Sequence, residues 1–382
     1  MKRNEDRMEI LIYENSSGFA NYSYKICNEL SIMTQKKISY MTDKINIYLD
    51  DIDNGVNVMP ILKNPSNIKT KRFFWFVNRV YVGICNIFIR NSYIKKNKVD
   101  VLNIQSTLSI FEQFFIKKIV KKVKVILTVH DVIPPIRSFY WSKKSLKKLY
   151  KAVSLLIVHS EENRKQLIEQ FGIEESKIKI IHHGTDTEYN RIDKDECLDY
   201  FNINKDNSKL FLFFGLIREQ KGLDVLITSI EKLKEPCRIL IAGSMPNGES
   251  FEKYERLITK PERYVKMIKF IEEEEIDYLF QAVDAVVFPY KYFYSQSGVF
   301  MQCIKYRKPI IATDVSSFRQ YIEKYEIGLI AKPNDYISLK QVLEQFILMS
   351  EEEVTRIEKN IEQASYENSW KKAAELYIKC FE

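Results

Sequence analysis

The segment from Asp284 to Pro309, DAVVFPYKYFYSQSGVFMQCIKYRKP, holds the pattern on which the rest of the chain is built. Its first residues, 284–288, are typical of a short buried strand, and an amphipathic helix is predicted from Gly298, after the polar turn at 295–297. Such a turn leaves backbone N–H groups unpaired at the positive end of the helix dipole, where phosphate binds well. The alternative is that Ser297 only caps a buried helix, and this segment alone favours that alternative.

The same order of strand, loop and helix recurs throughout the chain. Apolar runs followed by helical patterns lie at 8–13, 99–104, 123–129, 154–159, 210–214, 237–242, 310–313 and 328–331. Buried strands that alternate with helices of this length predict parallel sheets made of right-handed βαβ units. We therefore predict the α/β class, with two doubly wound Rossmann-like domains that face an interdomain cleft, where sheets of this kind bind ligands.

The length of the chain fits two domains. It has 382 residues, of which 45% are hydrophobic and 29% are charged, as is typical of globular proteins. A polar, irregular stretch separates the two series of apolar runs. We predict an N-terminal domain over 1–187, a linker over 188–208, a C-terminal domain over 209–365, and a helix within 366–382 that could pack back on the N-terminal domain.

Cysteine and histidine usage argues against several classes of protein. The six cysteines include no CxxC pair, which indicates reduced cytosolic thiols rather than disulfides or zinc ligands. The four histidines form no HExxH motif, so we predict no metal site and no metal dependence. The first ten residues, MKRNEDRMEI, lack the apolar core of a signal peptide, and the apolar patch at 80–85 is too short to cross a membrane.

Positive charge is concentrated in the first half of the chain. Residues 1–185 hold 31 Lys and Arg against 17 Asp and Glu, a net charge of +14, whereas the remainder holds 28 against 34, a net charge of −6. This asymmetry indicates a polyanionic partner for the first half, which could be nucleic acid, anionic lipid or a substrate with a pyrophosphate group.

A histidine stands at the end of the apolar run 123–129. His130 is followed by Asp131 and the rigid pair Pro134-Pro135. A lone histidine is usually structural, but the carboxyl end of a parallel strand is where ligands bind in such sheets. Its imidazole could hydrogen-bond to a hydroxyl group or assist proton transfer. In the first strand-to-helix loop, Gly18 either forms a turn that needs positive φ or lets a phosphate or sugar approach the backbone.

Five segments, read in order, resemble the family 4 retaining glycosyltransferases of the GT-B fold. They are HDxxP at 130–134, HSEENRKQLIEQFGI and IKIIHHGTD within 159–186, GLIREQKGLDVLI at 215–227, AGS at 242–244 and SGVFMQCIKYRKPIIATDV at 297–315. The likeness covers nearly the whole chain. It implies that the C-terminal domain holds a nucleotide-sugar and that the N-terminal domain holds the acceptor.

In that family a basic pair after the first strand of the C-terminal domain grips the donor diphosphate. The matching residues here are Arg218 and Lys221, although the usual Gly-Arg dipeptide is Gly215-Leu216, so the arginine stands two places later. Two cations and a helix N-terminus can stabilise a departing nucleoside diphosphate without a metal. Together with His130, they are predicted to be catalytic. The alternative is that both cations merely begin a solvated helix.

The family often carries two glutamates eight positions apart, and this chain lacks both. Counted back from Pro309, the first falls near Tyr294 and the second at Gln302, whose amide can still bond to ribose hydroxyls. Neutral hydrogen bonds from the polar turn would replace the first glutamate. The predicted donor-binding residues are Gly18, Ser295, Gln296, Ser297, Gly298, Val299 and Gln302.

The resemblance therefore implies a metal-independent hexosyltransferase of cell-surface polysaccharide synthesis. It would move a hexose from a nucleotide-sugar, UDP- or GDP-linked and with UDP preferred, to a glycan or lipid-linked saccharide, with retention of anomeric configuration. The donor is a substrate, and no cofactor is expected. One alternative is a non-catalytic glycosyltransferase-like partner subunit, because the family's glutamates are missing. Another is a nucleic-acid binder, although the basic first domain carries no motif of a known nucleic-acid module.

Two basic amphipathic segments, 71–94 and 141–150, could face an anionic membrane surface. Core packing explains most of the apolar positions in the first. We predict a cytoplasmic protein, attached peripherally to the inner face of the plasma membrane.

Overall fold

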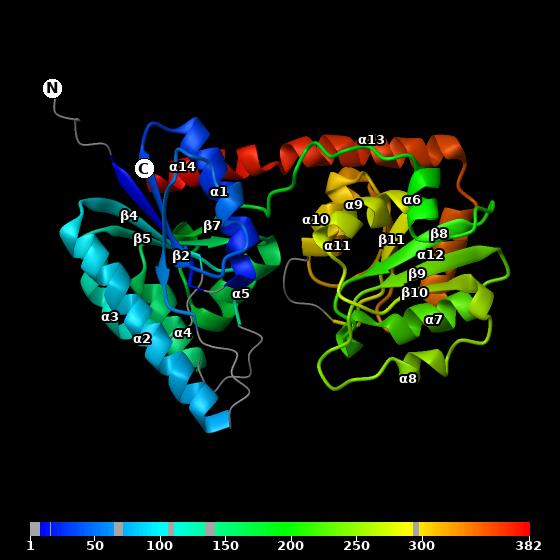
Figure 1. The fold of residues 1–382 in the computed structure, drawn as a ribbon, viewed down its shortest axis with the longest axis horizontal. Helices are drawn as coiled ribbons and strands as arrows, with labels where there is room; N and C mark the ends of the chain where they lie inside the picture. Colours follow the sequence, from blue (N-terminus) through cyan, green and yellow to red (C-terminus); the bar gives the residue numbers. More distant parts are fainter. Residues whose placement is uncertain (1–7, 16, 65–71, 106–110, 134–141, 293–297) are drawn as a thin grey trace. The chain divides into compact units, whose positions relative to one another are not determined.

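The chain folds into two compact units. Unit 1 comprises residues 1–184 and 370–382, and unit 2 comprises residues 185–369 (Figure 1). The computed structural model describes residues 8–15, 17–64, 72–105, 111–133, 142–292 and 298–382. The chain crosses between the units twice, after Gly184 and after Ser369.

Unit 1 is built on a parallel sheet with the strand order β3-β2-β1-β4-β5-β6-β7. Its strands are β1 Glu9–Tyr13, β2 Lys37–Asp43, β3 Asn57–Leu62, β4 Val99–Ile104, β5 Lys124–Thr128, β6 Leu155–Val158 and β7 Ile178–Ile180. Its helices are α1 Ala20–Met33, α2 Arg72–Lys96, α3 Glu112–Ile119, α4 Lys143–Ala152, α5 Glu161–Phe171 and α14 Trp370–Phe381, with 3-10 turns η1 Ser17–Phe19, η2 Leu49–Asp51 and η3 Glu175–Lys177.

Unit 2 repeats this scheme with the strand order β10-β9-β8-β11-β12-β13. Its strands are β8 Lys209–Phe214, β9 Cys237–Ala242, β10 Tyr264–Met267, β11 Ala285–Phe288, β12 Ile310–Thr313 and β13 Gly328–Ala331. Its helices are α6 Lys194–Tyr200, α7 Leu223–Glu231, α8 Glu252–Glu255, α9 Glu273–Ala282, α10 Gly298–Lys305, α11 Phe318–Tyr325, α12 Tyr336–Ile347 and α13 Glu351–Glu367, with 3-10 turns η4 Glu219–Lys221 and η5 Pro261–Arg263.

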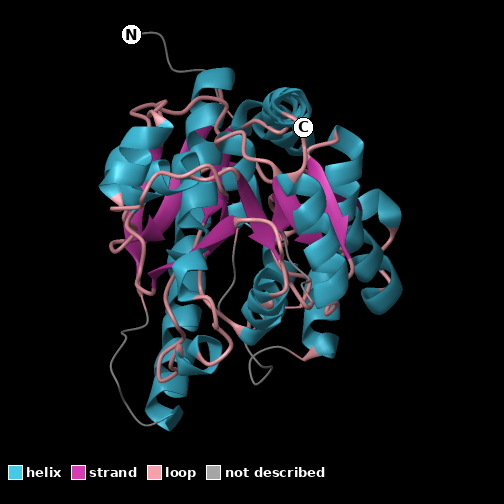
Figure 2. Ribbon diagram, turned by 90° about the vertical axis from the view of Figure 1, so that its right-hand side faces the viewer, coloured by secondary structure: helices cyan, strands magenta, loops and turns pink. Residues whose placement is uncertain are grey.

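Both sheets are buried on both faces, which is why their strands read as continuous apolar runs. In β1, Leu11 and Tyr13 enter one core cluster, whereas Ile10 and Ile12 enter another on the opposite face. Strand β8 divides its residues between two clusters in the same way. Figure 2 shows helices flanking the strands. The predicted fold class, two doubly wound Rossmann-like domains, is confirmed.

The segment 188–208, which the sequence presents as a linker, contains helix α6 and lies within unit 2. Its residues Cys197, Leu198 and Ile203 are buried in the core of that unit. Helix α6 packs against α9. Cys197 and Leu198 of α6, with Ile203 after it, anchor this polar stretch to the unit, because burial removes their apolar surface from water.

One residue of the basic segment 71–94 does not belong to a surface. Arg90 is fully buried, and its guanidinium donates two hydrogen bonds to the carboxylate of Glu112, at 2.8 and 3.0 Å. It also lies over the Tyr13 ring, 4.9 Å from its centre. Arg90 therefore adds no positive charge to the surface of the segment 71–94, because its guanidinium is neutralised by the Glu112 carboxylate inside the protein.

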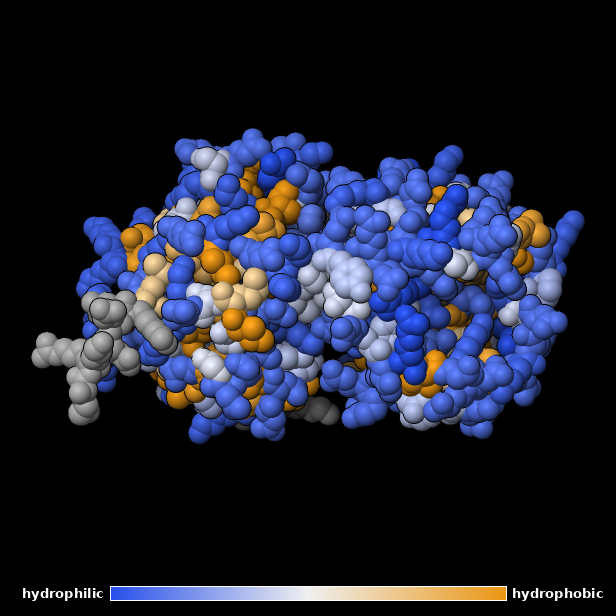
Figure 3. Space-filling view, turned by 90° about the horizontal axis from the view of Figure 1, so that it is seen from above, coloured by the Kyte–Doolittle hydropathy of each residue, from blue (hydrophilic) through white to orange (hydrophobic). Residues whose placement is uncertain are grey.

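The surface drawn in Figure 3 is mostly hydrophilic, with apolar side chains in patches between polar ones. In the part of the chain that the structure describes, no helix combines the length and apolar character needed to cross a bilayer.

Candidate functional site

In unit 2, the loop after β8 lies against the end of β9 because two glycines meet there. Gly215 and Gly243 have φ angles of +102° and +149°, which favour glycine. A Cβ atom on Gly243 would lie 2.1 Å from the carbonyl oxygen of Gly215, which leaves no room for a side chain. The loop is thereby held at the carboxyl end of the sheet, next to the point where the strand order reverses between β8 and β11. Ligands bind at such points in α/β sheets.

The 3-10 turn η4 places Lys221 at this strand end. Its Nζ lies 3.5 Å from the carbonyl oxygen of Phe214 and 5.5 Å from the centre of the Tyr290 ring. The next residue, Gly222, has a φ of +67°, and a Cβ atom there would lie 1.9 Å from the carbonyl oxygen of Pro289. The glycine thus lets η4 rest directly on the backbone after β11.

The Lys221 ammonium has no counter-ion among the described residues. Burial, together with the positive charge of Arg218, lowers the pKa of Lys221 to about 8. Nearby, Lys291 differs in that its Nζ lies 2.7 Å from a carboxylate oxygen of Asp224. Arg218 itself is exposed and immediately precedes η4. Two cations therefore stand at the start and the end of one short turn, and the largely buried one lacks a counter-ion among the described residues, so the turn forms a site for an anion.

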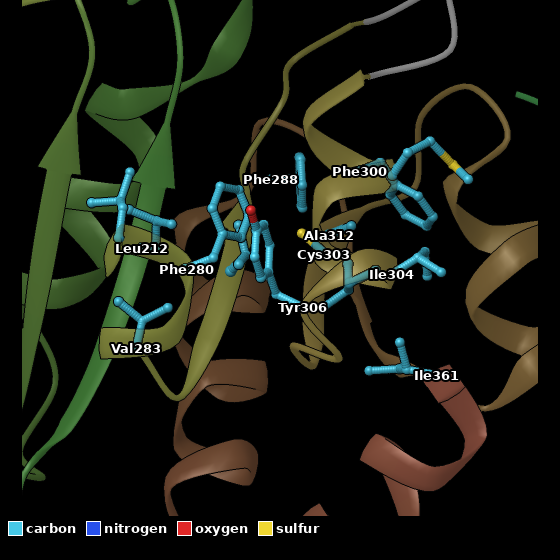
Figure 4. Close-up of a cluster of buried hydrophobic side chains, with 14 of the residues drawn as sticks. Leu212, Phe280, Val283, Phe288, Phe300, Cys303, Ile304, Tyr306, Ala312 and Ile361 are labelled. Carbon is cyan, nitrogen blue, oxygen red and sulfur yellow. The ribbon is translucent and has the colours of Figure 1, made fainter. Parts of the chain in front are cut away.

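Helix α10 begins beside this turn. Its second residue, Val299, has a methyl group 3.6 Å from where a Cβ of Gly215 would stand, and Gly298 has open space around it. The Gln302 side-chain oxygen is buried without a hydrogen-bond partner among the described residues. Figure 4 shows what holds the helix: Phe300, Cys303 and Ile304 lie in the core with side chains of the neighbouring strands.

The structure therefore brings together the predicted residues Arg218, Lys221, Gly298, Val299 and Gln302 at one end of the unit 2 sheet. The predicted residues Ser295, Gln296 and Ser297 lie outside the described residues.

All four histidines of the chain gather in unit 1, where β5, β6 and β7 end. His130 Nδ1 lies 3.0 Å from His159 Nε2, and His182 Nδ1 lies 3.0 Å from the carbonyl oxygen of His159. The rings of His159 and His183 lie 6.0 Å apart. Among the described residues, no group of His, Cys, Asp and Glu is placed to hold a metal ion.

Aromatic rings close the cluster around His130. Phe19 stacks on the imidazole at 3.9 Å with an interplanar angle of 10°, and Tyr22 meets it edge-on at 5.0 Å. Gly18, predicted to contact the donor, is exposed in η1 next to Phe19. Burial is the main cause that holds the pKa of His130 well below its usual value. The imidazole is therefore neutral at physiological pH.

Two family models match most of the chain between them. Residues 61–189 match the model described as Glycosyltransferase Family 4, and residues 199–364 match the model described as Glycosyl transferases group 1. The chain belongs to the GT-B glycosyltransferases. The Lys221 turn lies in the part matched by Glycosyl transferases group 1, and the His130 cluster lies in the part matched by Glycosyltransferase Family 4.

Curated relatives of this glycosyltransferase share low sequence identity with it. A D-rhamnosyltransferase of Pseudomonas aeruginosa is 25% identical over 169 residues, which are 44% of this chain and 43% of the relative. An α-D-kanosaminyltransferase of Streptomyces kanamyceticus is 27% identical over 132 residues, which are 34% of this chain and 33% of the relative. The matched part thus spans less than half the length of these relatives.

Solved structures match the fold over its full length. A glycosyltransferase from Rickettsia africae superimposes with a TM-score of 0.79 at 18% identity, covering 98% of each chain. An Anabaena protein, solved in complex with UDP and glucose, superimposes with a TM-score of 0.72 at 15% identity, covering 98% of this chain and 99% of the other.

The sequence did not lead us to expect that His159 lies against His130. The signal was present, since His159 ends one apolar run as His130 ends another. The two histidines follow adjacent strands, β5 and β6, so their side chains meet at the same edge of the sheet. Two histidines at the ends of consecutive predicted strands are thus a better signal than either histidine alone.

Proposed function

We propose that this glycosyltransferase moves a hexose from a UDP- or GDP-linked donor to a glycan or lipid-linked saccharide, in cell-surface polysaccharide synthesis. The reaction retains anomeric configuration and needs no metal. The observation that carries the proposal is the largely buried ammonium of Lys221, which has no counter-ion among the described residues and lies at the reversal point of a parallel sheet, beside the start of α10. An Anabaena protein of the same fold has been solved in complex with UDP-glucose, which supports a nucleotide-sugar donor.

The proposed chemistry in unit 2 is electrostatic. As the bond between sugar and diphosphate breaks, negative charge grows on the departing phosphate. The ammonium of Lys221 and the guanidinium of Arg218 neutralise it, and the α10 N-terminus adds the positive end of its dipole. Gln302, whose oxygen is buried and unpartnered among the described residues, accepts a hydrogen bond from a ribose hydroxyl.

In unit 1 we propose that His130 binds a sugar hydroxyl. Its Nε2 is buried and has no hydrogen-bond partner among the described residues. A buried polar atom left unpaired costs about 1–3 kcal/mol, which a hydroxyl ligand would recover.

Calorimetry with a panel of UDP- and GDP-sugars tests the proposal, followed by mass spectrometry of each donor after incubation with the protein. We expect one donor class to bind and then to be consumed, by transfer or by slow hydrolysis. Binding without consumption of any donor would instead favour a non-catalytic partner subunit. No binding of any nucleotide-sugar would refute the proposal.

The depressed pKa of Lys221 predicts that donor binding takes up a proton in alkaline solution. Free protein loses the Lys221 proton as pH rises through about 8, whereas a bound diphosphate stabilises the ammonium and raises its pKa. Affinity for UDP should therefore fall above about pH 8. Calorimetry at pH 9 in two buffers of different ionisation enthalpy should detect uptake of up to one proton per UDP.

Lys221→Arg provides the control for this experiment. A guanidinium stays protonated throughout this range, so the variant should bind UDP without proton uptake. Uptake that persists in the arginine variant would assign the proton to another group.

We also propose that α2 and α3 attach the protein peripherally to an anionic membrane, on the cytoplasmic side. Phe74, Val77, Tyr81 and Phe88 are 46–62% exposed and share one face of α2, at helical spacing. Phe114 of α3 is likewise exposed. Lysines 117, 118, 121 and 122, which follow Phe114 in the chain, are exposed and supply positive charge. Exposed apolar side chains together with lysines are typical of interfacial helices.

The double variant Phe74→Asp/Phe88→Asp should lose binding to vesicles that contain phosphatidylglycerol. The carboxylates would repel the anionic lipid and cannot enter its apolar region. Co-sedimentation at low salt measures the binding. Ile32→Asp, which changes a 74% exposed residue of α1, serves as the control. An equal loss of vesicle binding in the double variant and in Ile32→Asp would count against membrane attachment through this surface. So would a failure of the unmodified protein to sediment with the vesicles.

A further inference from the structure

A chain of hydrogen bonds crosses three adjacent strand ends in unit 1. His130 follows β5, His159 follows β6 and Ile181 follows β7, and these strands are neighbours in the sheet. The Nδ1 atom of His130 lies 3.0 Å from His159 Nε2, and the Nδ1 atom of His159 lies 2.8 Å from the carbonyl oxygen of Ile181. Both histidine rings are therefore tied to the backbone of a third strand.

The hydrogen bond between His159 Nδ1 and the Ile181 carbonyl oxygen decides which ring nitrogens carry protons. A carbonyl oxygen only accepts hydrogen bonds, so Nδ1 of His159 must carry a proton. Burial lowers the pKa of His159 to about 3, so its ring is neutral and its Nε2 is a bare lone pair. That lone pair can only accept, so Nδ1 of His130 must donate to it. His130 is neutral too, and its own Nε2 is left as an acceptor.

The described groups packed around His130 donate no hydrogen bond to its Nε2 atom. Phe19 covers one face of the ring and has no polar atom. Tyr22 meets the ring edge-on, but its hydroxyl lies 3.1 Å from that of Tyr377, which in turn lies 2.9 Å from the hydroxyl of Thr128. Among the described residues, His130 Nε2 therefore has no partner.

We propose that His159 is a positioning residue that holds His130 in the tautomer whose Nε2 accepts a hydrogen bond, so that the unit 1 site selects a ligand through an O–H donor. The identity of that ligand, a sugar hydroxyl, rests on the proposed function. This tautomer also narrows the role of His130: with its pKa depressed, the ring positions the hydroxyl as an acceptor and takes up no proton in the resting enzyme.

The tautomer can be read directly by NMR. The 382-residue chain labelled with ¹⁵N-histidine contains four imidazoles, and two-bond proton–nitrogen correlations show which nitrogen of each ring is protonated. The signals of His130 are assigned by their disappearance in His130→Gln. We expect a proton on Nδ1 of His130 and a bare Nε2. A proton on Nε2 of His130 in the free enzyme would overturn the inference, without any variant of His159.

Substitution of His159 tests the positioning role. His159→Phe keeps a ring but removes the lone pair, so His130 should change to the tautomer protonated on Nε2, and kcat/KM should fall about tenfold, the value of one hydrogen bond to the substrate. His159→Gln returns an oxygen acceptor near the Nε2 position and should restore the original tautomer and most of the activity. His182→Phe removes a neighbouring ring whose Nδ1 atom lies 3.0 Å from the carbonyl oxygen of His159, and it should leave the tautomer unchanged.

Failure of this inference is distinguishable from failure of the proposed function. The NMR measurement needs neither donor nor turnover, so it stands even if the protein transfers no sugar. If the protein transfers sugar and His159→Phe changes stability alone, with the His130 tautomer and kcat/KM intact, then His159 is a structural residue and the inference is wrong. If His159→Phe does not fold, the NMR spectrum of the unmodified enzyme still decides the tautomer of His130.

Discussion

Replacement of Lys221 with alanine should lower kcat/KM for the nucleotide-sugar by about 10²- to 10³-fold, the loss typical of removing one preorganised group that stabilises transition-state charge. The ammonium lies at the end of the unit 2 sheet without a counter-ion among the described residues. Its interaction with the leaving diphosphate strengthens as the donor bond breaks, so kcat should fall more than KM rises. Steady-state kinetics with the preferred donor measures both.

The stability of the same variant separates this role from a structural one. A largely buried ammonium with a depressed pKa costs the folded state free energy, so Lys221→Ala should melt no lower than the unmodified protein. Lys205→Ala is the control: Lys205 is exposed in unit 2 and pairs with Asp195 and Asp199, so its loss should leave kinetics unchanged. Near-normal turnover by Lys221→Ala would show that other groups carry the diphosphate charge.

The parts of the fold that sequence predicts are those determined by local chemistry. Strands buried on both faces need apolar side chains at every position, and this makes β8 (Lys209–Phe214) or β11 visible as short runs. The lysine–glycine step at 221–222 is equally local, because a left-handed residue after a 3-10 turn selects glycine. The fold class is therefore predictable from the apolar pattern alone, whereas Lys221 was identified through the resemblance of the segment 215–227 to a known family.

The parts that sequence does not reveal depend on partners far along the chain. Arg90 looks like a surface cation until Glu112, on another helix, is seen to pair with it. Helix α6 is only seven residues long, so its apolar spacing is too short to stand out from a polar stretch. The bond from His130 to His159 spans 29 positions and forms only because β5 and β6 are adjacent. Strand order is the information that the linear pattern lacks.

Gly222→Ala should destabilise unit 2 by roughly 3–5 kcal/mol, the range of severe single substitutions. Two effects combine: an alanine at φ +67° is strained, and its Cβ would stand 1.9 Å from the backbone oxygen of Pro289, which cannot rotate away. Gly248→Ala is the matched control, because Gly248 also has positive φ, at +85°, but has open space around it. The stability of Gly248→Ala should fall only by the cost of backbone strain, about 1–2 kcal/mol. Denaturant unfolding of both variants measures the difference.

The same pair of variants links the backbone to the donor site. Gly222 follows Lys221 directly, and the Lys221 amide donates to the Arg218 carbonyl at 2.9 Å, so η4 moves as one turn. If Gly222→Ala relieves its clash by lifting this turn from Pro289, the two cations move together, and UDP should bind more weakly even where the variant is fully folded. Calorimetry well below the unfolding transition isolates this effect. Gly248→Ala should bind UDP normally, and an equal loss of UDP affinity in both variants would mean that strain anywhere in unit 2, and not the position of η4, controls the site.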